Sequence, residues 1–258
     1  MNINSDYEKI VRFWQNKKIT NSNELETALN GYVVLFAYHS GKIENNNITY
    51  NDTREIFDHD GVSSYTGDLR TLFEIRNAKD ASDFILDAFE HQMPLDLSFI
   101  CKLQYCLTKN TYDPRRYAIG ERPGEFKKHD YVTGRYETGA TPADVKDEIS
   151  ELLGEIAEMR FKDNDQILTA AAYFHAKFEN IHPFSDGNGR TGRLAMNYFL
   201  LRQNTPPIVF HEEDRKLYYQ SLEKWDTLQN LRPIKLFLQI QAIKTWQKIA
   251  SRENKFSR

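Results

Sequence analysis

Residues 182–193 read His-Pro-Phe-Ser-Asp-Gly-Asn-Gly-Arg-Thr-Gly-Arg, a polar, glycine-rich loop between two segments with helical periodicity. The end of this stretch is expected to form the first turn of the second helix, where free backbone N–H groups and the helix dipole favour phosphate. Gly187 and Gly189 allow the backbone to approach an anion closely. Arg190 and Arg193 are three positions apart and share one helix face, which suits a polyphosphate. The stretch therefore predicts a phosphate site at a helix N-terminus.

Two further side chains of this loop carry chemistry. Asp186 offers a hard oxygen ligand of the kind that Mg²⁺ uses when it bridges phosphates. His182 can act as a general base near neutral pH. Taken singly, each feature has an ordinary structural explanation, as a helix end, a turn or a solvated face. Together they predict one site that combines a base, a metal ligand and a charge clamp, with Pro183 and Phe184 anchoring the loop in the core.

The loop resembles the signature of the Fic family, His-x-Phe-x-(Asp/Glu)-Gly-Asn-Gly-Arg-x-x-Arg, at every fixed position. The wider resemblance covers residues 95–237. It implies a protein adenylyltransferase that moves AMP from ATP to a Tyr, Thr or Ser hydroxyl of a target protein, with possible modification of the enzyme itself. The resemblance assigns roles to the loop residues as follows: His182 is the base, Asp186 holds Mg²⁺, Asn188 forms an anion hole with nearby backbone amides such as those of Gly187 and Gly189, and Arg190 and Arg193 bind the β- and γ-phosphates.

The segment 112–142 is expected to form a small β-hairpin, because Pro and Gly residues separate short runs such as 131–133 and 135–136. This hairpin resembles the Fic flap, which pairs with an extended segment of the target as an added strand. The match places Thr133, Gly134, Arg135 and Tyr136 near the nucleotide and the target. An ordinary surface hairpin is the alternative.

Two neighbouring tyrosines follow the loop in a later helical segment. Family members place tyrosines here against the adenine, so the resemblance assigns Tyr218 and Tyr219 to the nucleotide pocket. Packing in the core is an equally good explanation. Many relatives have Asn seven residues after the second tyrosine, whereas this chain has Asp226. A carboxylate there could accept from a ribose hydroxyl or from the adenine amino group.

Residues 40–45 read Ser-Gly-Lys-Ile-Glu-Asn and match the Fic inhibitory pattern (Ser/Thr)-x-x-x-Glu-(Gly/Asn). Ser40 and Glu44 are four apart and share a face if this segment is helical. Because the pattern precedes the loop, the chain resembles the subclass with an N-terminal inhibitory helix, class II. The resemblance implies that Glu44 pairs with Arg193 in the place of the γ-phosphate. A solvated helix end is the alternative.

Helical periodicity dominates the rest of the chain, so the expected fold class is all-α, a helical bundle of the Fic type with a small hairpin flap. Helices are expected at residues 22–39, 53–59, 69–89, 97–107, 144–159, 163–181, 190–203, 214–225 and 233–248. The expected parts are an N-terminal helical region with the inhibitory pattern (1–92), the catalytic core (93–240) and a C-terminal helix end and tail (241–258).

Composition narrows the function classes. The chain has 258 residues, a net charge of −3 and 40% hydrophobic residues, including 16 Phe and 14 Tyr. Without a basic balance or stripe, a nucleic-acid partner is not expected. No apolar run reaches the ~20 residues that span a bilayer, so no membrane partner is expected either. The two cysteines and the absence of a recognisable leader predict a reduced, cytoplasmic location. No oligomeric state is predicted.

Other functions on the same fold stay open at this level. Some relatives phosphorylate their targets or transfer UMP or phosphocholine, but the phosphorylating type usually has Lys where Gly189 stands. Removal of AMP is another alternative, because some members use the inhibitory glutamate to orient water. A catalytically silent binding module is the alternative outside enzymes, and the complete signature argues against it. The favoured activity is adenylyl transfer with ATP as substrate and Mg²⁺ as cofactor, inhibited by Glu44.

Overall fold

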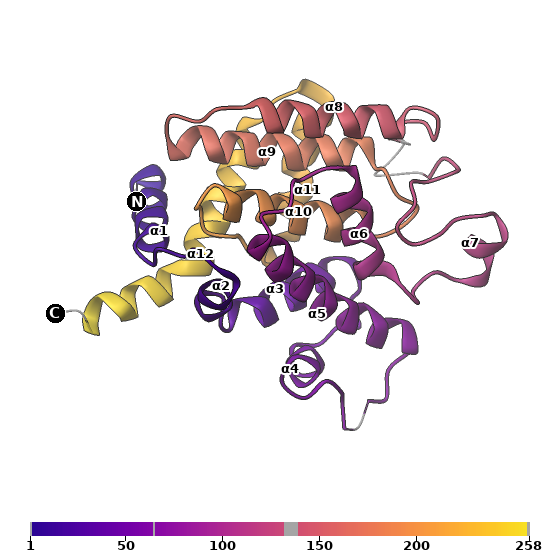
Figure 1. Cartoon of the computed structure of the whole chain (residues 1–258), viewed down its shortest axis with the longest axis horizontal. Helices are drawn as coiled ribbons and strands as arrows, with labels where there is room; N and C mark the ends of the chain where they lie inside the picture. The colour runs from indigo at the N-terminus through magenta and orange to yellow at the C-terminus, as the bar shows by residue number, and fades with distance from the viewer. Residues whose placement is uncertain (1, 64, 132–138, 257–258) are drawn as a thin grey trace.

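The computed structural model describes residues 2–63, 65–131 and 139–256 and is all-helical over them, which confirms the predicted fold class (Figure 1). Its elements are α1 (Ile3–Gln15), α2 (Ser22–Ala28), α3 (Tyr32–Glu44), α4 (Tyr50–His59), α5 (Leu69–Glu90), α6 (Leu97–Thr108), α7 (Pro114–Ala118), α8 (Val145–Glu158), α9 (Asn164–Ile181), α10 (Asn188–Arg202), the 3-10 turn η1 (Glu212–Asp214), α11 (Arg215–Leu228) and α12 (Arg232–Phe256).

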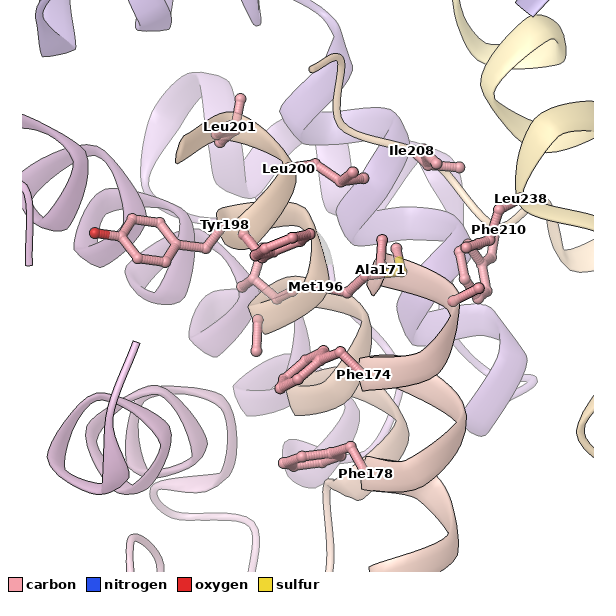
Figure 2. Close-up of a cluster of buried hydrophobic side chains, with 14 of the residues drawn as sticks. Ala171, Phe174, Phe178, Met196, Tyr198, Leu200, Leu201, Ile208, Phe210 and Leu238 are labelled. Atoms are coloured by element: carbon pink, nitrogen blue, oxygen red, sulfur yellow. The ribbon is translucent and has the colours of Figure 1, made fainter. Parts of the chain in front are cut away.

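The centre of the molecule is α10, which packs against α9, α6, α3 and α5. All of its residues from 190 to 201 are buried, so the helix is covered on every side, as expected of a central helix. Figure 2 shows Met196 and Leu200 of α10 in one cluster with Phe174 and Phe178 of α9. The loop 182–187 joins these two helices and is therefore held at both ends by the most deeply buried part of the fold.

The N-terminal helix α1 was not predicted from the sequence and packs on α12. Trp14 of α1 meets Trp246 of α12 edge to face, with ring centroids 5.1 Å apart, and Tyr32 of α3 stacks on the same indole at 5.5 Å. Buried residues from all three predicted parts of the chain thus contribute to a single hydrophobic core. Within the described residues, no helix is both long and apolar enough to cross a membrane.

The single helix expected at residues 22–39 is wrong, because the chain breaks into α2 and α3. Gly31 precedes α3 with φ of 77°, a left-handed conformation that is favourable for glycine and ends the regular helix. The break lets α3 run in its own direction, and α3 is the helix that carries Ser40 and Glu44.

The described part of the 112–142 segment contains no strand; its one regular element is the short helix α7. Apart from Tyr131, which is not in a strand, the two strand runs of the predicted hairpin lie outside the described residues, and so do Thr133, Gly134, Arg135 and Tyr136. The residues that precede that region are held by hydrogen bonds. The buried carboxylate of Glu121 accepts from Lys128 N at 2.9 Å and from the Tyr131 hydroxyl at 2.9 Å.

A buried amide fixes α3 to the centre of the fold. Asn197 of α10 donates to the Tyr32 hydroxyl at 3.0 Å and to Ile208 O at 2.9 Å, and its Oδ1 accepts from Ile208 N at 2.8 Å. Because Asn197 is 2% exposed, water cannot replace these bonds easily.

We expect Asn197→Ala to lower the free energy of unfolding by about 1–3 kcal/mol, since it leaves the buried N–H of Ile208 unpaired, while Ile208 O keeps the bond from the Tyr32 hydroxyl at 3.3 Å. Chemical denaturation measures this loss. The control is Asn51→Ala at an exposed position of α4, which should change stability by less than about 0.5 kcal/mol. Equal midpoints for the two variants would contradict the role given to Asn197.

Candidate active site

Two residues in left-handed conformations define the ends of the loop. His182 follows α9 with φ of 51°, and its N–H donates to Phe178 O at 3.0 Å. Gly187 precedes α10 with φ of 82°. A Cβ atom on Gly187 would lie 2.6 Å from Thr108 Cγ2, so this position requires glycine for both conformation and space. The loop therefore presents the first turn of α10 to the site.

Side chains inside and beside the loop fix its shape. Phe184 is fully buried and stacks on Phe126 with centroids 5.4 Å apart, in agreement with its predicted anchoring role. Asn188 Oδ1 accepts from Phe184 N at 2.8 Å, and Asn188 Nδ2 donates to Phe184 O at 2.7 Å. Gln104 of α6 donates to Asp186 O at 2.9 Å. Both polar atoms of the Asn188 side chain thus brace the loop.

His182 is half-buried beside the loop. Burial, followed by the nearby charge of Lys127, lowers the pKa of His182 to about 4. Lys127 belongs to the segment that leads to the predicted flap, and its N–H donates to Pro183 O at 2.9 Å. The imidazole of His182 is therefore neutral at pH 7, which is the form that can accept a proton.

Arg193 of α10 is fully buried and is bound by the end of α3. Its Nε donates to Ser40 Oγ at 3.0 Å, and its Nη2 donates to Ser40 O at 2.9 Å and to Glu44 Oε1 at 2.8 Å. Burial opposes the charge of Arg193, but the surrounding acidic groups, with Glu44 first among them, together outweigh burial and raise the pKa of the guanidinium above its ordinary value. The structure thus shows the pair of Glu44 and Arg193 that the resemblance implied, and it adds two hydrogen bonds from Arg193 to Ser40 that were not predicted.

A second carboxyl group, that of Glu179, lies near Arg193 but is not its main countercharge. Burial raises the pKa of Glu179 on α9 to about 8, so this side chain is mainly protonated at pH 7. The carboxylate that accepts a hydrogen bond from Arg193 is that of Glu44. Gly189 makes room for that contact, because a Cβ atom there would lie 2.5 Å from Glu44 Oε1 and 2.9 Å from Arg193 Nη1.

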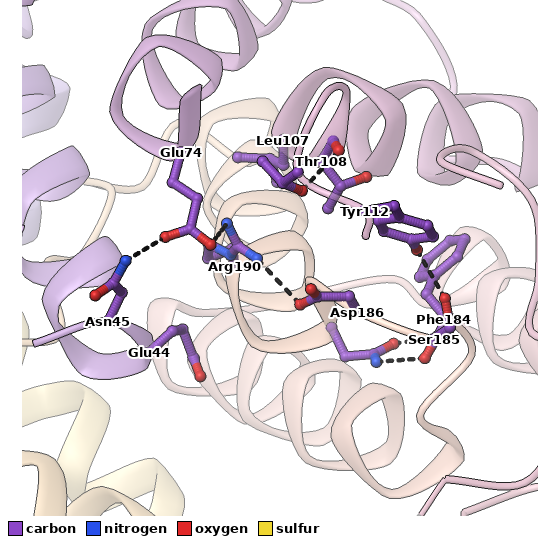
Figure 3. A network of polar contacts seen from close by, with 12 residues as sticks. Glu44, Asn45, Glu74, Leu107, Thr108, Tyr112, Phe184, Ser185, Asp186 and Arg190 are labelled. Carbon is purple, nitrogen blue, oxygen red and sulfur yellow. Dashed lines mark hydrogen bonds and ion pairs between the residues drawn. The ribbon is translucent and has the colours of Figure 1, made fainter. Parts of the chain in front are cut away.

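A network of charges surrounds Asp186 (Figure 3). Arg190 Nη2 donates to Asp186 Oδ1 at 3.2 Å, and Arg190 Nη1 lies 3.7 Å from Glu74 Oε1. Glu74 Oε2 in turn accepts from Asn45 Nδ2 at 2.7 Å. On its other side, Asp186 Oδ2 accepts from Arg70 Nη2 at 2.9 Å. The last residue of the inhibitory pattern is therefore linked to the proposed metal ligand through α5.

Two arginines of α10, Arg190 and Arg193, have buried N–H donors that form no hydrogen bond among the described residues. Nη1 of Arg193, and Nε and Nη1 of Arg190, have no hydrogen-bond partner among the described residues. A cavity of about 420 Å³ adjoins the network; Arg190 lines it together with Glu44 and Asp186, whereas Arg193 does not line it and reaches its edge only through Glu44. Buried donors without acceptors beside a cavity favour an anionic ligand.

The residues that were predicted to line the adenine pocket differ in their exposure to solvent. Tyr218 is 1% exposed, and its hydroxyl forms a hydrogen bond with His175 Nε2 at 3.0 Å, so it is part of the core. Tyr219 is 41% exposed and presents its ring beside Arg215. The third residue, Asp226, accepts at Oδ1 a hydrogen bond from Asn180 Nδ2 at 2.9 Å. Asn180 stands two positions before His182 in the chain.

Sequence reasoning missed Arg70, Glu74, Gln104 and Lys127. The spacing of Arg70 and Glu74 indicates a pair on one helix face, which the structure shows at 3.1 Å. Nothing in that spacing indicates contact with a loop 116 positions later.

Comparison with known proteins places this site in a family. The sequence model of the Fic/DOC family matches residues 94–200. A protein adenylyltransferase Fic from Culex quinquefasciatus is 30% identical over 192 residues, which cover 72% of this chain and 35% of that protein. The protein adenylyltransferase fic-1 of Caenorhabditis briggsae is 26% identical over 223 residues, covering 83% and 41%. The chain thus spans only 35–41% of the length of these two relatives.

Solved structures share the fold. A Fic domain-containing signaling protein from Bacteroides thetaiotaomicron has a TM-score of 0.76 at 23% identity, covering 94% of this chain and 95% of that one. Residues 134–508 of Fic-1 from Caenorhabditis elegans give a TM-score of 0.73 at 22% identity, covering 99% and 75%. With the complete signature loop seated between α9 and α10 of this shared fold, the chain belongs to the Fic/DOC family.

Proposed function

We propose that this protein is an adenylyltransferase that transfers AMP from ATP to a hydroxyl group of a target protein. The observation that carries the proposal is the convergence, at the N-terminus of α10, of a neutral histidine, a carboxylate and two buried arginines with free donors. The names of the relatives from Culex quinquefasciatus and Caenorhabditis briggsae, both protein adenylyltransferases, support it.

In the proposed reaction, His182 removes the proton from the target hydroxyl while its oxygen attacks the α-phosphorus of ATP. The new P–O bond forms as the bond between the α-phosphorus and the bridging oxygen breaks, and pyrophosphate leaves. Backbone N–H groups in the first turn of α10 stabilise charge on the transferred group. Asn188 contributes by holding the loop through Phe184. Arg190 and Arg193 direct their free donors to the β- and γ-phosphates.

The residues present fit a magnesium ion bound together with the nucleotide. Mg²⁺ is commonly held by one or two carboxylates plus substrate phosphates and water. Asp186 supplies one such carboxylate, with its side chain 16% exposed at the cavity. When bound, Mg²⁺ would neutralise phosphate charge and thereby favour departure of pyrophosphate. Asp186 would hold this ion.

The contact between Glu44 and Arg193 is proposed to inhibit transfer. Glu44 accepts a hydrogen bond from Nη2 of the guanidinium that would otherwise bind the γ-phosphate. A nucleotide that cannot use Arg193 would bind with its α-phosphate out of line for attack. The target is proposed to dock at the flap, residues 133–136, as an added strand, and the enzyme itself is a candidate target.

Replacement of the base tests the proposed role of His182. We expect His182→Ala to reduce AMP transfer by about 10²–10⁴-fold, the usual contribution of a general base, with ATP affinity nearly unchanged. Incorporation of labelled AMP, measured in a Glu44→Gly background, gives the rate. The exposed His91→Ala is the control. Transfer at the parent rate by the His182 variant would remove this residue from the mechanism.

Metal removal tests the proposed role of Asp186. Excess EDTA should abolish transfer by the wild type, and readdition of Mg²⁺ should restore it, because the ion compensates phosphate charge. Asp186→Ala should lose the Mg²⁺-dependent activity even at high Mg²⁺. Full activity in EDTA would show that Asp186 does not act through a metal.

Removal of the inhibitory carboxylate tests the brake. We expect Glu44→Gly to raise AMP transfer at least about tenfold, equivalent to ~1.4 kcal/mol of activation barrier, because Arg193 becomes free to align ATP. Adding Arg193→Ala should cancel the gain. Labelled AMP on the enzyme or in a lysate measures both effects.

Glu158→Gly is a matched control, since Glu158 is also the exposed last residue of a helix. Equal labelling by wild type and Glu44→Gly would mean that residues 40–45 are only a helix end. A loss of AMP removal from a pre-labelled protein would instead assign Glu44 to the reverse reaction.

A further inference from the structure

Asp186 has both carboxylate oxygens engaged by arginines. Arg190 donates to Oδ1 at 3.2 Å and Arg70 donates to Oδ2 at 2.9 Å. A third guanidinium, that of Arg116, lies 4.0 Å from Oδ2. A cation that binds this carboxylate has to compete with these arginines, because like charges repel each other at such short distances.

The two hydrogen-bonded arginines differ in how firmly they are held. The side chain of Arg190 is 7% exposed and belongs to the central helix α10. The side chain of Arg70 is 47% exposed and reaches the loop from α5. Exposed ion pairs contribute little free energy, whereas a buried charge is costly to leave unpaired. Arg70 is therefore the arginine that can leave Asp186 at low cost.

Arg70 also has a second partner that can retain it. Its Nε donates to Glu74 Oε1 at 3.1 Å, one helical turn away, and this bond uses a different nitrogen from the one that donates to Asp186. Glu74 is 7% exposed and holds Asn45 Nδ2 at 2.7 Å, so this carboxylate is fixed against the end of α3. The helix that positions Arg70 is thereby tied to the inhibitory segment.

We propose that Arg70 is a positioning residue that occupies the cation-binding oxygen of Asp186 and is displaced when a divalent cation binds. The inference rests on the metal-binding role proposed for Asp186. It gives the α3–α5 side of the molecule a second point of control, because Glu44 engages Arg193 while Arg70, held by Glu74, engages Asp186. The displaced guanidinium stays beside the cavity of about 420 Å³, which Arg70 and Glu74 also line.

The test measures binding of Mn²⁺, used in place of Mg²⁺ because free Mn²⁺ is quantified by electron paramagnetic resonance. Arg70→Gln removes the competing charge and keeps a polar side chain. We expect it to bind Mn²⁺ about three- to fivefold more tightly than the wild type, the factor that an exposed ion pair is worth. Arg70→Lys, which keeps the charge, should remain close to the wild type.

Arg76→Gln is the matched control, because Arg76 lies on the same helix, is 43% exposed and pairs with an acid four positions later, Asp80. Its Mn²⁺ affinity should equal that of the wild type. In an Asp186→Ala background, Arg70→Gln should give no gain.

Unchanged or weaker Mn²⁺ binding by Arg70→Gln would overturn the inference, and so would a gain that persists without Asp186 or that Arg70→Lys reproduces in full. Labelled AMP transfer by the same variants in the Glu44→Gly background is a separate readout. If the Mn²⁺ gain appears and no variant transfers AMP, the proposed function fails while the role of Arg70 stands. If transfer occurs and the gain does not, the reverse holds.

Discussion

The rest of the site depends on the burial of one charge, the guanidinium of Arg193. An unpaired cation on the central helix would be strongly destabilising, so the fold must bring acceptors to it. The end of α3 supplies them, two from Ser40 and one from Glu44. Glu179, although close by, is kept mainly protonated by burial and does not supply the countercharge at pH 7. Two glycines are compatible with this pairing: Gly31 separates α3 from α2, and Gly189 leaves space for the carboxylate of Glu44.

The other charged residues of the loop are also paired with opposite charges within the protein. Arg193 has Glu44, Asp186 has Arg70, and Arg190 lies between Asp186 and Glu74. These pairs connect α3, α5 and α10 and let the site fold without a ligand. In the function proposed above, ATP with a divalent cation would bring both kinds of charge, so it would exchange partners with the protein instead of adding an isolated charge. The free-energy cost of binding such a ligand would then depend on how easily the more exposed residue of each pair leaves its partner.

Contiguous features of this site were predictable from the sequence, whereas contacts between distant segments were mostly not. The loop could be recognised because its glycines, base and arginines are close in sequence, and Ser40 and Glu44 because their spacing forms a known pattern. The helix α1 was missed although Tyr7, Ile10, Val11 and Trp14 have helical spacing, which shows that its signal was readable. Arg70 could not be assigned, because an i,i+4 pair with Glu74 has the same pattern on any solvated helix. Periodicity likewise could not decide whether Tyr218 faces the core or a ligand, which only packing of α11 against its neighbours determines.

Exposure decides which member of the Arg193 pair can move. The side chain of Arg193 is fully buried, while that of Glu44 is 34% exposed and sits at the last turn of α3. If Glu44 withdraws, Arg193 keeps both hydrogen bonds to Ser40 and stays where it is, with its countercharge missing. An anion that reaches the guanidinium restores that countercharge. In the inhibition proposed above, Glu44 and the anion would compete for one cation, so each would weaken the binding of the other by the same free energy. Withdrawal of the Glu44 side chain alone would therefore strengthen anion binding at Arg193, and an anion bound there would weaken the contact of Glu44.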